Sequence, residues 1–138
     1  MQDDIILNKS SIIERCIGRI NEEYGNDPYS LSNYTKQDSI ILNIQRACEA
    51  CIDIAMHLIS VKGLGIPQRS RDCFAILEKA GILQSDLSTQ LMAMVGFRNI
   101  AIHEYQEIDI NIVQQIVEKH LGCLLNFVKI ILDSNIEK

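Results

Sequence analysis

Apolar residues recur along most of the chain with the spacing of an amphipathic helix. Near the start they stand three, four and seven positions apart, which places them on one helical stripe. The residues of this stripe are Ile5, Ile6, Ile12, Ile13, Cys16, Ile17 and Ile20. We therefore predict a first helix from Ile5 to about Tyr24, followed by Gly25 as the C′ residue and by a loop around Pro28.

A second and longer helix is predicted from Thr35 to Lys62. At about 1.5 Å per residue it would be roughly 40 Å long, the longest element of the protein. Thr35 and Asp38 resemble a capping box in which Asp replaces the usual Glu. The helix should end at Gly63, because Gly63, Gly65 and Pro67 stand within the five residues after Lys62.

Three more helices are predicted, each with a polar residue that can cap its start. Ser70 precedes a short helix over 71–80, Ser85 or Ser88 opens a fourth helix that reaches 98–105, and Asp109 precedes a fifth that runs to about 133. No strand pattern or repeat interrupts this order. The pattern predicts an all-α fold, an antiparallel four- or five-helix bundle, in one domain spanning 1–138.

Composition agrees with one aliphatic core. The chain has 138 residues, 47% hydrophobic and 22% charged, with 5% aromatic residues and no Trp. The acidic start lacks a secretory signal, and no apolar run approaches the about 20 residues of a membrane span, so we expect a cytoplasmic protein without a membrane segment. Five cysteines, an odd number, are expected to be free thiols.

The formal net charge of −5 argues against broad binding to nucleic acid, so any such site must be local. One stretch, 54–71, has no acidic residue and contains Lys62, Arg69 and Arg71. These cations could guide RNA, or they could belong to a solvated loop beside a helix start. The sequence leaves both interpretations open.

The densest group of chemically capable residues is Arg98, Asn99, His103 and Tyr105, within eight positions. Taken singly, Arg98 could make a surface salt bridge, His103 could favour a helix C-terminus, and Tyr105 could simply pack. Taken together, a permanent cation suited to phosphate oxygens and a side chain that moves protons near neutral pH suffice for RNA cleavage without a metal. We therefore predict Arg98 and His103 to be the catalytic pair.

Arg98 and His103 are five positions apart, which limits how both can reach one phosphate. Five positions on an ideal helix separate two side chains by about 140° around the axis. Either the helix ends between Arg98 and His103, or two protomers bring their motifs together in a symmetric cleft. We favour the second arrangement, a homodimer, with some local distortion of the helix.

Arg98-x-x-x-x-His103-x-Tyr105, with Asn99 directly after the arginine, resembles the signature of HEPN ribonuclease toxins of the HepT type. The long segment 45–59 and the residues 95–99 are also similar to that family. The resemblance covers nearly the whole chain, and none of the four motif positions departs from it.

The resemblance implies a HEPN bundle that dimerises with its motifs facing each other. It implies a metal-independent endoribonuclease, without a cofactor, that acts as the toxin of a type II toxin–antitoxin system. The implied partner is an MNT-type minimal nucleotidyltransferase antitoxin, which forms a larger hetero-oligomer with the toxin and silences it by attaching AMP to Tyr105. Asn99 would position the motif. The alternative is a non-catalytic HEPN module that binds a nucleotide or the nucleotidyltransferase, a role that suits the negative charge.

Other clusters favour structural interpretations. Cys48-x-x-Cys51 lies inside the long helix without a second pair at matching spacing, so it is expected to be apolar filling rather than a zinc or redox site. Asp53 and His57 could share a proton or a metal, but a helix ion pair explains them. His120 has no companion and is expected at the surface or at a dimer rim.

Overall fold

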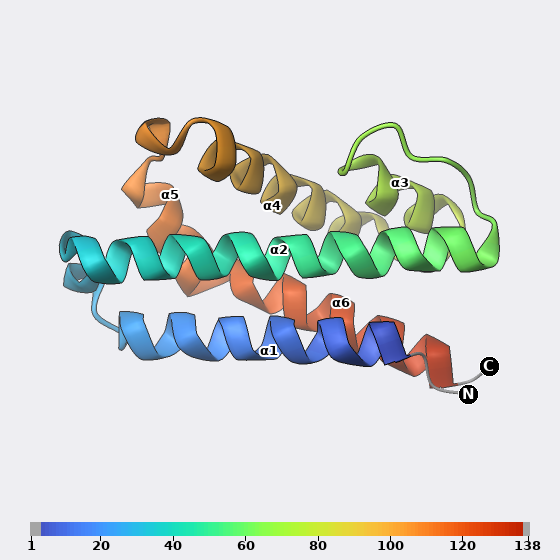
Figure 1. Ribbon diagram of the computed structural model, residues 1–138, viewed down its shortest axis with the longest axis horizontal. Helices are drawn as coiled ribbons and strands as arrows, with labels where there is room; N and C mark the ends of the chain where they lie inside the picture. Colours follow the sequence, from blue (N-terminus) through green and yellow to red (C-terminus); the bar gives the residue numbers. More distant parts are fainter. Residues whose placement is uncertain (1–3, 137–138) are drawn as a thin grey trace.

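The computed structural model describes residues 4–136, and it is an antiparallel bundle of helices (Figure 1). The two long helices α1 and α2 run in opposite directions beside each other, α4 returns on the other side of α2, and α6 runs back beneath. The α-helices are α1 (Asp4–Tyr24), α2 (Tyr34–Lys62), α3 (Asp72–Lys79), α4 (Ser85–His103), α5 (Ile110–Gln115) and α6 (Leu121–Ile136). The predicted all-α bundle is confirmed.

The start of α2 differs from the prediction in its capping residue. The side chain of Asn33 accepts a hydrogen bond from the backbone N–H of Lys36, so Asn33 is the N-cap and Thr35 lies inside the first turn. The Thr35–Asp38 capping box is therefore the wrong interpretation. The end was predicted correctly, because Gly63 adopts the left-handed conformation, at φ 64°, that closes the helix.

The short helix α3 also starts without its predicted cap. Arg71 occupies the N-cap position and makes no capping hydrogen bond through its side chain, so Ser70 is not the cap. Instead, the carboxylate of Asp72 accepts hydrogen bonds from the backbone N–H groups of Gln68 and Arg69, at 3.2 and 2.9 Å. This acidic residue in the first turn fixes the loop that leads into α3.

The predicted fifth helix is interrupted in its first half. Asp109 caps α5 as expected, and its side chain accepts a hydrogen bond from the backbone N–H of Asn111 at 2.9 Å. A π-helical turn, η3 (Ile116–His120), then joins α5 to α6. Two short 3₁₀ turns complete the chain, η1 (Pro28–Ser32) in the predicted loop and η2 (Tyr105–Glu107) directly after α4.

The core is aliphatic and lies between the helices. On α1, Ile6, Ile13 and Ile20 repeat every seven residues and all three are fully buried. Phe74 of α3 and Phe127 of α6 meet edge to face, with ring centroids 5.6 Å apart. This aromatic pair fixes the short helix α3 against the rest of the bundle.

Two polar links join elements that are distant in the sequence. Lys9 of α1 and Asp53 of α2 form a salt bridge of 2.9 Å, so the ion pair of Asp53 connects two helices. The hydroxyl of Tyr24 donates a hydrogen bond to Glu118 of the π turn. Burial, together with that carboxylate, raises the pKa of Tyr24 to about 12.

The five cysteines are free and buried, as expected. Burial raises the pKa of Cys48 to about 12 and that of Cys51 well above its ordinary value, so neither thiol ionises readily. This agrees with a structural role for the Cys48-x-x-Cys51 pair. Within 4–136, every helix is too short or too polar to cross a membrane.

Candidate active site

Arg98, Asn99 and His103 lie at the C-terminal end of α4, on an unbroken helix, and Tyr105 follows in the turn η2. Helix α4 includes both Arg98 and His103 and ends only at Glu104, whose backbone turns to φ −141° and ψ 52° while its N–H still bonds to the carbonyl of Ile100 at 2.8 Å. The alternative in which the helix ends between Arg98 and His103 is therefore wrong. The two side chains leave one regular helix in different directions.

The guanidinium of Arg98 is held by two neighbours. Its Nη1 donates to Oδ1 of Asn99 at 2.9 Å, and its Nη2 donates to Oγ of Ser70 at 3.3 Å. Its Nε is buried and has no hydrogen-bond partner among the described residues. A buried N–H group that has no protein acceptor commonly pairs with water or with a bound ligand.

Ser70 was not predicted as a site residue, and it brings the basic loop to the motif. Its hydroxyl contacts Arg98 across 28 residues of sequence. Arg69 and Arg71 flank it, and both side chains are exposed. Two cations of the 54–71 stretch, Arg69 and Arg71, are thus neighbours in sequence of a residue that contacts the motif.

His103 is exposed and lines an open hollow of about 420 Å³ at the end of α4. The hollow is formed by Ile102, His103, Glu104, Tyr105, Gln106 and Glu107. Arg98 does not line it. Within one chain, His103 and Tyr105 therefore line the same hollow, and Arg98 lies outside its lining.

The side chain of Tyr105 contacts the N-terminal part of the long helix α2. Its hydroxyl donates a hydrogen bond to the carboxylate of Asp38, in the second turn of α2. Burial and that carboxylate raise the pKa of Tyr105 to about 12. Sequence reasoning missed this role of Asp38, because it assigned the side chain to capping its own helix.

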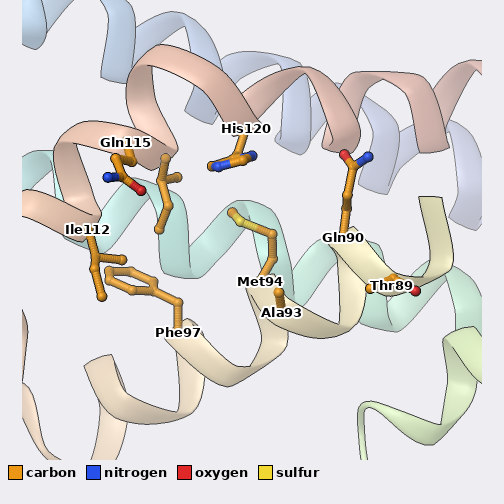
Figure 2. A pocket seen from close by; sticks show the side chains of 9 residues that line it. Thr89, Gln90, Ala93, Met94, Phe97, Ile112, Gln115 and His120 are labelled. Carbon is orange, nitrogen blue, oxygen red and sulfur yellow. The ribbon is translucent and has the colours of Figure 1, made fainter. Parts of the chain in front are cut away.

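A second hollow, of about 370 Å³, lies between α4 and the α5–η3 segment and is mostly apolar (Figure 2). Figure 2 shows Met94 and Phe97 on the α4 wall, with His120 reaching toward them from the π turn. His120 is exposed, as expected. No motif residue lines this hollow, although Phe97 directly precedes Arg98.

The helical bundle and the motif at the end of its fourth helix define a HEPN-type protein. A family model described as Ribonuclease HepT-like matches residues 13–131. The chain is 48% identical over 129 residues to the mRNA nuclease HepT of Shewanella oneidensis, an alignment that covers 94% of this chain and 97% of that relative. The chain belongs to the ribonuclease HepT-like family.

Solved structures agree with this assignment. The chain resembles a crystal structure of a toxin–antitoxin with AMP-PNP, with a TM-score of 0.92 and 46% identity over 95% of this chain and 99% of that one. It also resembles the tri-AMPylated Shewanella oneidensis HEPN toxin in complex with MNT antitoxin, with a TM-score of 0.91 and 47% identity over 96% and 99% of the two chains. At these identities the likeness extends to the family as well as to the fold.

Proposed function

We propose that this chain is a metal-independent endoribonuclease toxin in which Arg98 and His103 form the catalytic pair. The observation that carries the proposal is the state of the two side chains. The guanidinium of Arg98 is oriented by Asn99 and Ser70, while His103 lines an open hollow at the end of the same helix. A fixed cation and an accessible imidazole are the two groups that metal-free cleavage of RNA needs.

The reaction needs two proton transfers, one from the attacking 2′-hydroxyl and one to the 5′-oxygen that leaves. His103 takes the proton of the ribose 2′-hydroxyl, or protonates the leaving 5′-oxygen, as the 2′-oxygen attacks its own phosphorus. The P–O5′ bond breaks and leaves a 2′,3′-cyclic phosphate and a 5′-hydroxyl. Arg98 neutralises the charge that builds on the phosphoryl oxygens, and Asn99 keeps its guanidinium aligned.

A homodimer would complete the site. In one chain Arg98 and His103 face different surroundings, so a two-fold pair of α4 helices is the simplest way to bring both to one phosphate. Ile100 and Ile102 flank the motif, and each is 40% exposed. A partner protomer that covers them would bury apolar surface beside the motif.

We propose that an MNT-type nucleotidyltransferase antitoxin neutralises the chain by attaching AMP to Tyr105, within a larger hetero-oligomer. The solved relative described as a tri-AMPylated toxin in complex with MNT antitoxin supports this partner class. Tyr105 is 43% exposed and shares the hollow of His103, so an adduct there would occupy the RNA path. Its anionic phosphate would also attract Arg98 away from substrate.

We place this activity in the cytoplasm. Five buried thiols without a disulfide suit a reducing compartment.

The test is cleavage by the purified chain in the presence of EDTA. Wild type should cut RNA and leave a 2′,3′-cyclic end, whereas His103→Ala should lose the activity and keep its helical circular dichroism. His120→Ala, a second exposed histidine outside the motif, is the matched control and should cut normally. Cleavage that stops with the chelator and returns with a divalent ion would contradict the metal-free mechanism. A folded wild type that cuts no RNA would favour the alternative of a non-catalytic binding module.

A further inference from the structure

A separate basic hollow lies between α1 and α2, away from the motif. Its volume is about 230 Å³, and its walls are more polar than those of the hollow in Figure 2. It is lined by Ile12, Arg15, Cys16, Arg19, Asn43 and Arg46. Three of its six lining residues are arginines and none is acidic, in a chain whose formal net charge is −5.

The side chains of the three arginines are unpaired in the part of the chain that the structure describes. Within 4–134, none of their guanidinium groups makes a salt bridge or a hydrogen bond. Arg15 and Arg19 are one turn apart on α1, an arrangement in which like charges destabilise a helix. Within the described residues, the hollow therefore holds three positive charges that no direct ion pair compensates.

The three arginine charges also act on one neighbouring side chain, the thiol of Cys16. Cys16, which lines the hollow, has a pKa that burial raises, while Arg46, Arg15 and Arg19 all oppose that rise. Asn43 is buried beside it, and its amide nitrogen bonds to the backbone carbonyl of Ser39 at 2.8 Å. Three arginines line one small polar hollow, and guanidinium groups are well suited to phosphate oxygens.

We propose that Arg15, Arg19 and Arg46 form a phosphate-binding site that takes the backbone of the RNA strand at a distance from the bond that is cut. The proposal rests on the ribonuclease function proposed above and adds a second point of substrate contact. An acidic protein segment would be the other partner for such charges. Guanidinium groups bind carboxylates and phosphates alike, and we favour phosphate because the proposed RNA substrate supplies it along the whole strand.

A surface ridge leads from the motif to this site. Asp38, Leu42 and Arg46 are spaced by four on α2 and so form one ridge of the helix. Asp38 holds Tyr105 at one end, exposed Leu42 lies between, and Arg46 stands at the hollow. The eight helical steps from Asp38 to Arg46 span about 12 Å. At about 3.4 Å of strand per phosphate, this is the length of three to four stacked nucleotides.

The experiment compares two RNA substrates that share the cleaved bond, a trinucleotide and a long single strand. The variant carries Arg15→Gln, Arg19→Gln and Arg46→Gln, and the matched control carries Lys79→Gln, Lys119→Gln and Lys129→Gln, which removes the same charge from exposed sites elsewhere. We expect the arginine variant to raise KM for the long RNA about tenfold, with kcat unchanged, and to cut the trinucleotide normally. The salt dependence of KM should weaken by about 0.7 in logarithmic slope for each phosphate that the variant no longer neutralises.

Direct binding separates this inference from the proposed function. The long RNA is titrated onto His103→Ala protein with and without the three arginine substitutions, by fluorescence anisotropy, and AMP and inorganic phosphate are titrated onto wild type and the arginine variant. Equal binding of the long RNA, or an equal weakening in the lysine control, overturns the proposal. AMP or phosphate binding that needs the arginines, with unchanged RNA binding, assigns the hollow to a free phosphate compound and overturns the strand assignment. Absence of cleavage of both RNAs by wild type rejects the ribonuclease function itself.

Discussion

The hydroxyl of Tyr105 donates a hydrogen bond to the carboxylate of Asp38, 67 residues earlier in the chain. This contact holds the turn η2, which follows α4 directly, against the N-terminal part of α2. Any group attached to the tyrosine oxygen removes the donated proton, and an anionic group would then face the carboxylate of Asp38 and repel it. Modification of Tyr105 would therefore release η2 as well as fill the opening.

The contact should be visible in the titration of Tyr105. Asp38→Asn removes the charge but keeps an acceptor, so the pKa of Tyr105 should fall from about 12 toward its ordinary value of 10 while burial continues to hold it above that value. Absorbance of the tyrosinate form against pH measures this, and Tyr105→Phe identifies which transition belongs to Tyr105.

The same shift links stability to alkaline pH. Because the folded-state pKa of Tyr105 is raised, its contribution is complete below pH 10 and disappears as the pH rises toward 12. Asp38→Asn should weaken this alkaline loss. A Tyr105 transition that stays near 12 in Asp38→Asn would mean that the carboxylate does not hold the hydroxyl.

Ser70→Ala should weaken catalysis by loosening Arg98. The substitution removes the acceptor of Nη2, and a hydrogen bond to a charged group contributes about 1.5–3 kcal/mol, less where water can replace it. We expect a drop of about tenfold in kcat/KM, measured on a short RNA, with helicity retained. Ser11→Ala, an exposed serine on α1, is the control. Unchanged kcat/KM would show that Asn99 alone orients the guanidinium.

Tyr105→Phe should abolish modification by the nucleotidyltransferase. After co-expression with the cognate antitoxin, intact mass of the wild type should increase by one or more AMP units of about 329 Da, and that of Tyr105→Phe by none, because the acceptor oxygen is gone. Tyr29→Phe, at an 82% exposed tyrosine outside the motif, should gain mass as wild type does. The same gain in Tyr105→Phe would place the acceptor elsewhere.

Ile102→Glu should disrupt the proposed dimer. A carboxylate on the motif helix would be buried or repelled in a two-fold interface, so light scattering at micromolar concentration should give a monomer and cleavage should fall with it. Ile66→Glu, at an isoleucine that is 83% exposed in the loop before α3, is the control and should leave the mass unchanged. A monomer that cuts RNA at the full rate would refute the shared site.

Phe74→Ala tests the packing of α3. Phe74 is fully buried against Phe127, and truncation of a buried phenylalanine costs about 3–5 kcal/mol. Urea unfolding should report a decrease of this size in the free energy of unfolding. Ile66→Ala, at the exposed loop position, should change it by less than about 0.5 kcal/mol. A small decrease at Phe74 would mean that the core closes around the cavity.

Periodicity is sufficient for the helices, because a buried stripe repeats with a fixed spacing. Ile6, Ile13 and Ile20 predict the inner face of α1, and Gly63 predicts the end of α2. The π turn at 116–120 cannot be found this way, since its apolar residues fit a continuous α-helix nearly as well. The true cap of α2, Asn33, escapes prediction because Thr35 and Asp38 form a plausible competing pattern.

The candidate site likewise contains residues that sequence can reveal and residues that only tertiary packing reveals. Arg98, Asn99, His103 and Tyr105 are neighbours in sequence, so a local motif is enough to propose them as site residues. Ser70 and Asp38 reach the motif from 28 and 67 residues away, through contacts that depend on how α3 and α2 pack against α4. Both are polar residues near helix starts, and capping is the role that sequence alone makes visible for such residues.

The antiparallel order of the bundle has a practical consequence. Helix α1 begins and helix α6 ends at the same end of the bundle, whereas η2 lies at the opposite end (Figure 1). The hollow that His103 lines is formed around η2. A surface anchor attached at either terminus would therefore orient the motif toward the solution. Immobilised protein should thus present the end that carries η2 and the proposed site to RNA and to the nucleotidyltransferase alike, so single-molecule tethering can show whether the two compete.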